Sequence, residues 1–119
     1  MKQFLITFCL LGLLNTSCKP TQLGSKTNPI SIYFTPSVDA KIIEENSSIF
    51  IKYLEKNTNL SFKAYIPSDY FSVIEALGSK RADICIMNSF GYLLANQKFG
   101  AKAKLKVIRR GKDYYRGQI

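Results

Sequence analysis

The stretch that decides the fold is "LSFKAYIPSDYFSVIEALG" (Leu60–Gly78), because it changes from a strand pattern to a helix pattern within a few residues. Residues 60–66 are rich in β-forming side chains and stop at Pro67, which has no backbone N–H for a ladder. Asp69 is a good helix N-cap, and apolar residues then recur at helical spacing. We therefore expect a strand over 60–66 and a helix over 70–77, closed by the glycine.

The same alternation continues on both sides of this stretch. The residue 82–87 segment, "ADICIM", is almost continuously apolar, as expected of a central parallel strand. "YYRGQI" (Tyr114–Ile119) would begin a last strand. Right-handed crossovers then give an α/β fold, a mostly parallel sheet with helices on both faces. The other predicted elements are strands over 30–34 and 104–108 and helices over about 40–57 and 89–100.

The first 17 residues have the pattern of an export signal. Lys2 supplies the positive end, and "FLITFCLLGLL" (Phe4–Leu14) is an apolar run too short to span a bilayer comfortably. "NTSC" resembles the lipobox of bacterial lipoproteins and implies lipidation of Cys18, although Asn15 replaces the usual aliphatic residue. An acylated Cys18 would tether the chain without spanning the membrane. Residues 18–29, polar and with Pro, Gly, Ser and Thr, indicate a flexible tether.

Several kinds of chemistry are disfavoured by composition. The chain has no histidine and no CxxC pair, so neither a zinc site nor a histidine-dependent triad is expected. Cys9 would leave with the signal, and Cys85 lies in a buried-strand pattern, so no disulfide framework is implied. Without paired carboxylates as well, we expect a protein that is not an enzyme and needs no cofactor and no metal.

The formal charge of +9 is concentrated near the end of the chain. Residues 98–119 contain eight Lys or Arg and one acidic residue, a net +7. Such a region is explained by a solvated face close to anionic lipid, or by electrostatic attraction of an anionic ligand. Nucleic acid is not an expected partner, because an exported lipoprotein rarely meets it.

Three loops are candidates for a ligand site. In open parallel sheets, ligands bind beyond the carboxyl ends of the strands. This rule selects Thr35–Asp39, Ser68–Tyr70 and Asn88–Phe90, each with a Ser, Thr or Asn at the mouth of a predicted helix. Backbone N–H groups at helix N-termini can hold an anion. No glycine-rich phosphate cradle is present, so the loops indicate a binding cleft and not a nucleotide site.

Four stretches carry a resemblance to a known family: "TPSVDA" (Thr35–Ala40), "SDYFSVIEAL" (Ser68–Leu77), "ADICIMNSFGYLLA" (Ala82–Ala95) and "YYRGQI". In this order and spacing, the chain from about Ile30 to Ile119 resembles the N-terminal part of the phosphate/phosphite/phosphonate-binding proteins of ABC transporters. These proteins have the two-lobed type 2 periplasmic binding protein fold. The resemblance implies that residues 30–119 are a partial N-terminal lobe, apparently truncated.

The resemblance also implies the site. Tyr70 matches a family tyrosine that faces the ligand, although its spacing also suits packing beside Val73 and Ile74. Tyr115 matches a second ligand-side tyrosine, and a register shift by one would put Tyr114 there instead. If the segment is a strand, these two rings point to opposite faces.

The remaining candidates are polar residues of the loops. Ser37, Asn88 and Ser89 can supply donors to an oxyanion, but turn and capping roles would explain them equally. The family commonly has Gly-Pro where this chain has Asn88 and Ser89. Asp69 is expected to be an N-cap, and Arg116 can either pair with a phosphonate or lie exposed.

Together these observations predict a lipid-anchored, extracytoplasmic substrate-binding component of an ABC transporter for phosphonate, phosphite or a related oxyanion. Its partners would be a small oxyanion, the transporter permease and the membrane, and a monomer is expected. The family's second-lobe Ser-Thr pair has no counterpart here, so we expect residues 19–119 alone to bind a ligand weakly or not at all. A ligand-sensing module of the same fold and a structural lipoprotein are the alternatives.

Overall fold

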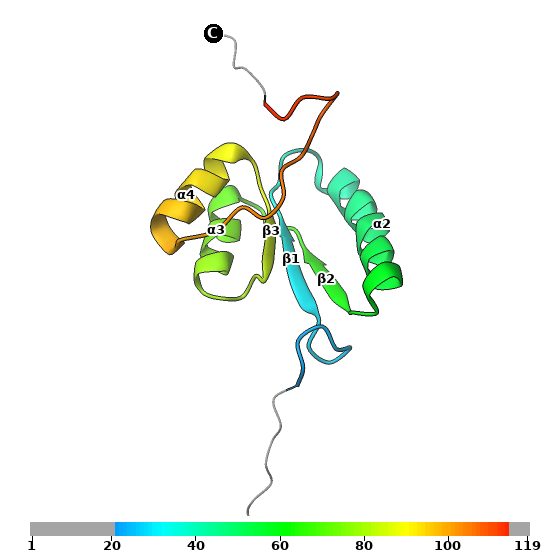
Figure 1. Cartoon of the computed structure of the whole chain (residues 1–119). Helices are drawn as coiled ribbons and strands as arrows, with labels where there is room; N and C mark the ends of the chain where they lie inside the picture. The colour runs from blue at the N-terminus through cyan, green and yellow to red at the C-terminus, as the bar shows by residue number, and fades with distance from the viewer. Residues whose placement is uncertain (1–20, 115–119) are drawn as a thin grey trace, which may run out of the picture.

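The computed structural model describes residues 21–114 and shows alternating strands and helices (Figure 1). The predicted strands over 30–34 and 60–66 and the helices over 40–57, 70–77 and 89–100 are all present, within a few residues of their expected ends. The elements are β1 (Ile30–Phe34), α2 (Ala40–Thr58), β2 (Phe62–Tyr65), α3 (Tyr70–Gly78), β3 (Ile84–Ile86) and α4 (Ser89–Phe99).

The three strands form one parallel sheet in the order β2-β1-β3. The expected α/β fold is therefore confirmed. The prediction that the residue 82–87 strand is central is wrong for the described residues, since β1 is central and β3 lies at an edge. β3 is only three residues long, and Ile84 and Ile86 remain 43% and 39% exposed. An apolar run signals a strand but does not say which strands flank it.

Helices cover both faces of the sheet (Figure 1). On one face α2 packs on β2, and its Ile43 is buried. On the other face α3 and α4 pack on each other, and Val73 of α3 accepts a hydrogen bond at its carbonyl from the Cys85 thiol of β3 (3.8 Å). The core is small, with Ile32 in the central strand and Val73 almost fully buried. The other buried apolar residues are Ile74, Ala76, Ala82 and Ala95.

Gly78 has a different role from the expected one. It is the last residue of α3, while Ser79 is the C-cap and Lys80 adopts the left-handed conformation, with φ of 58°. A Cβ atom added at Gly78 would lie 2.5 Å from the ring of Phe99. The helix does end at Gly78, as expected, but the glycine is explained by the close approach of α3 and α4 and not by a left-handed cap. Gly100, in contrast, is a left-handed C-cap and stands at the predicted end of α4.

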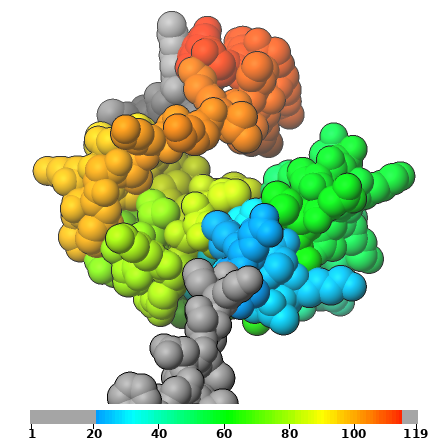
Figure 2. Space-filling model, turned by 60° about the horizontal axis from the view of Figure 1, so that its bottom comes forward, coloured from blue at the N-terminus to red at the C-terminus, as the bar shows by residue number. Residues whose placement is uncertain are grey.

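The predicted strand over 104–108 is not formed. Residues 101–108 have no regular secondary structure, and Leu105 and Val107 are 94% and 80% exposed. A short turn follows, closed by an isolated bridge between Arg109 and Lys112. Figure 2 shows this orange-to-red segment standing away from the body of the molecule. A strand needs a neighbouring edge to pair with, and this segment pairs with none of the described strands, although the outer edges of β2 and β3 have no partner within residues 21–114. The strand expected after Tyr114 lies outside the described residues.

Within residues 21–114, no helix combines the length and the apolar character that crossing a bilayer requires.

Candidate functional site

The carboxyl edge of the sheet brings the three candidate loops together. β1, β2 and β3 are parallel neighbours, so the loops that follow them leave the sheet on the same side (Figure 1). Each loop leads directly into a helix, and the N-termini of α2, α3 and α4 therefore begin at this edge. The first turn of a helix has N–H groups without intrahelical partners and a positive dipole end. The arrangement suits a negatively charged ligand.

The residue directly before each of these helices caps its N-terminus with a side-chain oxygen. Asp39 Oδ1 accepts a hydrogen bond from the Lys41 N–H (2.9 Å), and Asn88 Oδ1 accepts one from the Gly91 N–H (2.8 Å). Asp69 Oδ1 accepts one from the Ser72 N–H (2.9 Å), which confirms the predicted N-cap. The three helix N-termini differ in charge, because the caps of α2 and α3 are carboxylates and the cap of α4 is a neutral amide.

The carboxylate of Asp69 is held in its ionised form. The Ser72 hydroxyl donates to Asp69 Oδ2 (2.5 Å), and this bond together with the backbone N–H of Ser72 lowers the pKa of Asp69 below its ordinary value. A carboxylate that is ionised at neutral pH stabilises the N-terminus of α3. The same carboxylate repels an anion at the N-terminus of α3. The cap of α4, Asn88, is neutral, so the N-terminus of α4 is the most favourable of the three for an oxyanion.

Tyr70 is the first residue of α3 and lies at the same edge. Its side chain is half-buried, and within residues 21–114 its hydroxyl has no hydrogen-bond partner. Val73 and Ile74, by contrast, are 0% and 3% exposed and form the core face of the helix. Tyr70 therefore lies at the border of the core and is not one of its fully buried residues. Its predicted contact with a ligand stays a prediction.

The other predicted site residues are distributed as follows. Ser37 is exposed in the loop after β1, and its N–H donates to the Thr35 carbonyl (2.9 Å). Ser89 is the first residue of α4, next to the Asn88 cap. Tyr115 and Cys18 lie outside the described residues. Four predicted site residues thus lie in the loops or helix starts at one edge of the sheet, and their role in binding stays a prediction: Ser37, Tyr70, Asn88 and Ser89.

Thr35 is a positioning residue that sequence reasoning missed. It is 9% exposed, its N–H donates to the Ile86 carbonyl (3.1 Å), and its hydroxyl approaches the same oxygen (3.3 Å). These bonds tie the end of β1 to the end of β3 and so fix two of the three loops relative to each other. The threonine directly after a strand was visible in the sequence, but its partner 51 residues away was not.

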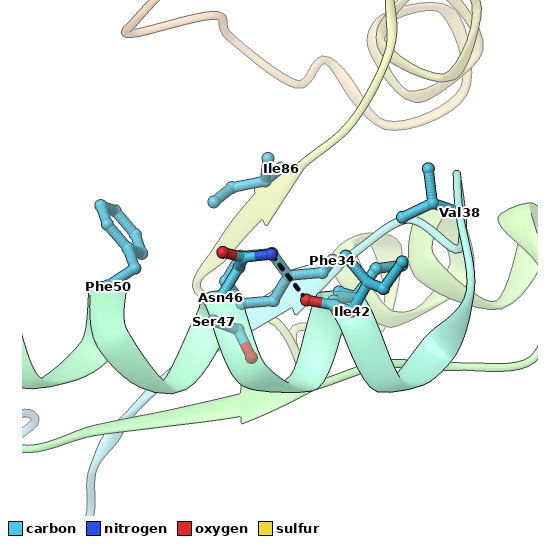
Figure 3. A pocket seen from close by; sticks show the side chains of 8 residues that line it. Phe34, Val38, Ile42, Asn46, Ser47, Phe50 and Ile86 are labelled. Carbon is cyan, nitrogen blue, oxygen red and sulfur yellow. Dashed lines mark hydrogen bonds between the residues drawn. The ribbon is translucent and has the colours of Figure 1, made fainter.

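An apolar hollow opens beside this edge, between α2 and the ends of β1 and β3 (Figure 3). Its volume is about 310 Å³. The hollow was not predicted from the sequence. Apolar residues of α2 nevertheless lie on two adjacent faces of the helix, one that contains the buried Ile43 and one that contains the exposed Ile42. The lining residues are Phe34, Val38, Ile42, Ile43, Asn46, Ser47, Phe50 and Ile86.

Cys85 has the properties of a structural thiol. It is half-buried on the α3 side of β3, and burial raises its pKa to about 11. The reactive thiolate is therefore scarce at neutral pH. Among residues 21–114, no three His, Cys, Asp or Glu side chains are grouped so that they could hold a metal ion.

The comparison with known families agrees with this edge-centred architecture. The sequence model of a family described as "ABC transporter, phosphonate, periplasmic substrate-binding protein" matches residues 32–119. The match begins inside β1 and includes all three loops at the carboxyl edge. The family is one of transport proteins that bind a substrate outside the cytoplasm, and it is not an enzyme family. The chain belongs to the family of periplasmic substrate-binding proteins of phosphonate ABC transporters.

Proposed function

We propose that this protein is the lipid-anchored substrate-binding component of an ABC transporter that takes up a phosphonate, phosphite or related oxyanion. The observation that carries the proposal is the parallel sheet, which directs three helix N-termini to one edge within the region of the family match. No covalent chemistry is required of the protein. Binding and release by movement of the lobes would signal occupancy to the permease, as in other hinged binding proteins.

The oxyanion would lie at the N-terminus of α4. The Asn88 cap there is neutral, whereas Asp39 and Asp69 place carboxylates at the other two mouths. Asn88 and Ser89 would contribute polar donors, and the Tyr70 hydroxyl would donate from α3 across the edge. Ser37 from the β1 loop and Tyr115 would complete the set. Hydrogen bonds to a charged oxyanion are short and about twice as strong as those between neutral groups.

The anchor would be an acylated Cys18, with residues 18–29 as the tether and residues 1–17 as a signal peptide that is removed. The domain would then work as a monomer on the outer side of the membrane. A Cys18→Ser variant should move from the membrane fraction to the soluble extracytoplasmic fraction and lose incorporated fatty acid. Retention of the variant in the membrane fraction, with fatty acid still attached, would contradict the anchor.

The site is tested by Asn88→Asp. Asp and Asn are equally good N-caps, so α4 should be retained while its mouth gains a negative charge. A charge about 4 Å from the ligand interacts strongly even at an effective dielectric constant of about 20, and we expect at least a tenfold loss of methylphosphonate affinity by calorimetry on the mature gene product. Gln97→Glu adds the same charge to an exposed position near the other end of α4 and should have little effect. Equal affinities for wild type and Asn88→Asp would refute this placement of the oxyanion.

A further inference from the structure

Residues 21–28 fold back onto the amino edge of the sheet, the edge at which the strands begin, and we call them the docked turn. The Gly24 N–H donates to the Asn28 carbonyl (2.8 Å), and the Gly24 carbonyl accepts from the Ser61 N–H (2.7 Å), directly before β2. Asn28 Nδ2 donates to the Thr21 carbonyl (2.9 Å) and so holds the first described residue. Figure 1 shows the docked turn, in blue, at the end of the sheet opposite the three loops.

Gly24 fits the docked turn to the domain. It is buried, and its φ of 85° is a conformation that side chains other than glycine rarely adopt. A Cβ atom added there would lie 2.8 Å from Leu60 Cδ2. The docked turn is therefore a packed part of the domain, held by backbone hydrogen bonds and by one close approach.

Docking leaves little free chain for the proposed anchor. Only residues 19 and 20 separate Cys18 from the docked turn. In any conformation, the three steps from Cys18 to Thr21 span at most about 11 Å, whereas a free segment from residue 18 to β1 would span up to about 40 Å. The headgroup layer on each side of a bilayer is about 5–8 Å thick. An acylated Cys18 therefore holds the amino edge at the membrane surface.

The amino edge is also basic. Four exposed basic side chains in the docked turn, at the end of α2 and between α3 and β3 have no ion pair within residues 21–114: Lys26, Lys56, Lys80 and Arg81. Of the acidic side chains there, Glu55 and Asp83 each accept a hydrogen bond from a backbone N–H near the start of a strand, and Glu75 is paired with Lys98. This excess of cations complements anionic lipid headgroups.

We propose that the amino edge rests on the headgroups of an anionic membrane, and that the carboxyl edge with its three loops faces away from the bilayer. This inference rests on the lipid anchor of the proposed function and adds to it an orientation and a second, electrostatic contact. A basic surface strengthens anchoring by an acyl chain. The candidate ligand site, at the opposite edge, stays open to the extracytoplasmic solution.

The orientation is tested on the acylated mature gene product in vesicles of equal parts phosphatidylcholine and phosphatidylglycerol. A fluorophore is attached at one of two exposed positions, Ala40→Cys or Asn57→Cys, which lie about 26 Å apart along α2. A lipid with a spin-labelled headgroup, which quenches only nearby fluorophores, should quench the label at position 57 and leave the label at position 40 bright. Protein without an added cysteine gives the background from Cys85. Equal quenching at both positions, or stronger quenching at position 40, would overturn the inference.

The role of the docked turn is tested by Gly24→Val. A β-branched residue is strongly disfavoured at this φ, so the turn should detach and the quenching at position 57 should fall toward that at position 40. Gly111→Val is the matched control, because Gly111 has a similar φ of 72° but lies in an exposed turn after α4. It should leave the quenching unchanged. Undiminished quenching in Gly24→Val would show that the docked turn does not hold the orientation.

The electrostatic contact is tested without the anchor, on the Cys18→Ser protein. It should sediment weakly with the same anionic vesicles at low salt, and not with phosphatidylcholine alone or at high salt. Lys56→Gln should weaken this association about fivefold, whereas Lys41→Gln, at the other end of α2, should not. Equal effects of the two substitutions would refute the contact.

The outcomes also separate this inference from the proposed function. Equal quenching on an acylated protein overturns only the orientation, whereas a Cys18 without fatty acid overturns the anchor as well.

Discussion

Removal of the Tyr70 hydroxyl separates a ligand contact from a packing role. Tyr70 is half-buried at the start of α3, and its hydroxyl has no partner within residues 21–114. Tyr70→Phe therefore breaks no hydrogen bond of the described fold and keeps the ring in place. A substitution that touches no structural feature changes stability by about 0.5 kcal/mol or less, so the melting temperature should be nearly unchanged.

Ligand affinity should respond quite differently. A hydrogen bond to a charged group contributes about 1.5–3 kcal/mol, and about 1.4 kcal/mol corresponds to a tenfold change in affinity. Tyr70→Phe should therefore weaken methylphosphonate binding by about 10- to 150-fold. Calorimetry gives the affinities, and a thermal melt of the same samples without ligand gives the stability.

Tyr53→Phe provides the control, because this tyrosine is 64% exposed on α2 and far along the helix from the carboxyl edge. Tyr53→Phe should change neither the methylphosphonate affinity nor the melting temperature. If Tyr70→Phe binds methylphosphonate as tightly as the wild type does, the hydroxyl makes no ligand contact. Tyr70 is then only a residue at the border of the core.

Three further predictions concern the fold. Gly78→Ala should lower the melting temperature, with an overpacking cost of about 1–3 kcal/mol, because the new Cβ would meet the Phe99 ring; adding Phe99→Ala should relieve that clash, and an unchanged melting temperature of Gly78→Ala would contradict it. Cys85 should be alkylated about a hundredfold more slowly in the folded than in the urea-unfolded protein at pH 8, because its pKa rises from 9.0 to about 11; equal rates by mass spectrometry would show an accessible thiol. Asp69 has a folded-state pKa below 3.8, so its ionised form stabilises the fold above that pH and this stabilisation disappears as the pH falls through the folded-state value. Urea unfolding of wild type and Asp69→Asn should therefore differ at pH 7 and converge at low pH, and a difference independent of pH would exclude the carboxylate as its source.

Local features of the fold were predictable from the sequence, and pairings between distant residues were not. Asp69 and Gly100 mark the ends of α3 and α4 because capping depends on residues three or four positions away. The role of Gly78 depends on Phe99, 21 positions later, and no local pattern contains that contact. Likewise, residues 104–108 alternate like a strand, yet a strand forms only where another edge accepts its hydrogen bonds.

The same distinction applies to the candidate site. The three loops were identified from the order of elements, because parallel strands place all their carboxyl ends on one side. The hollow was not identified, since it depends on how far α2 extends across the sheet. The predicted contact residue Tyr115 and the predicted lipidation residue Cys18 lie outside the described part of the chain, so both remain predictions.

Charge at the carboxyl edge has to be considered together with the basic segment that follows α4. Of the basic residues from Lys98 to Lys112, Lys98 pairs with Glu75 and Lys106 pairs with Asp113, both as exposed ion pairs. The remaining five have no ion pair within residues 21–114: Lys102, Lys104, Arg109, Arg110 and Lys112.

These five cations and the two carboxylate caps act over different distances. The carboxylate caps of α2 and α3 stabilise their own helices. At contact distance they also repel an anion from the N-termini of these two helices. The exposed cations extend a positive potential over roughly a Debye length, about 8 Å at physiological salt, which increases the local concentration of any anion without selecting its shape. In the proposed function, selection would depend on the short-range features, namely the neutral Asn88 cap and the Tyr70 hydroxyl. Such a division would let a chain with a net charge of +9 attract many anions at long range and still discriminate between them at contact distance.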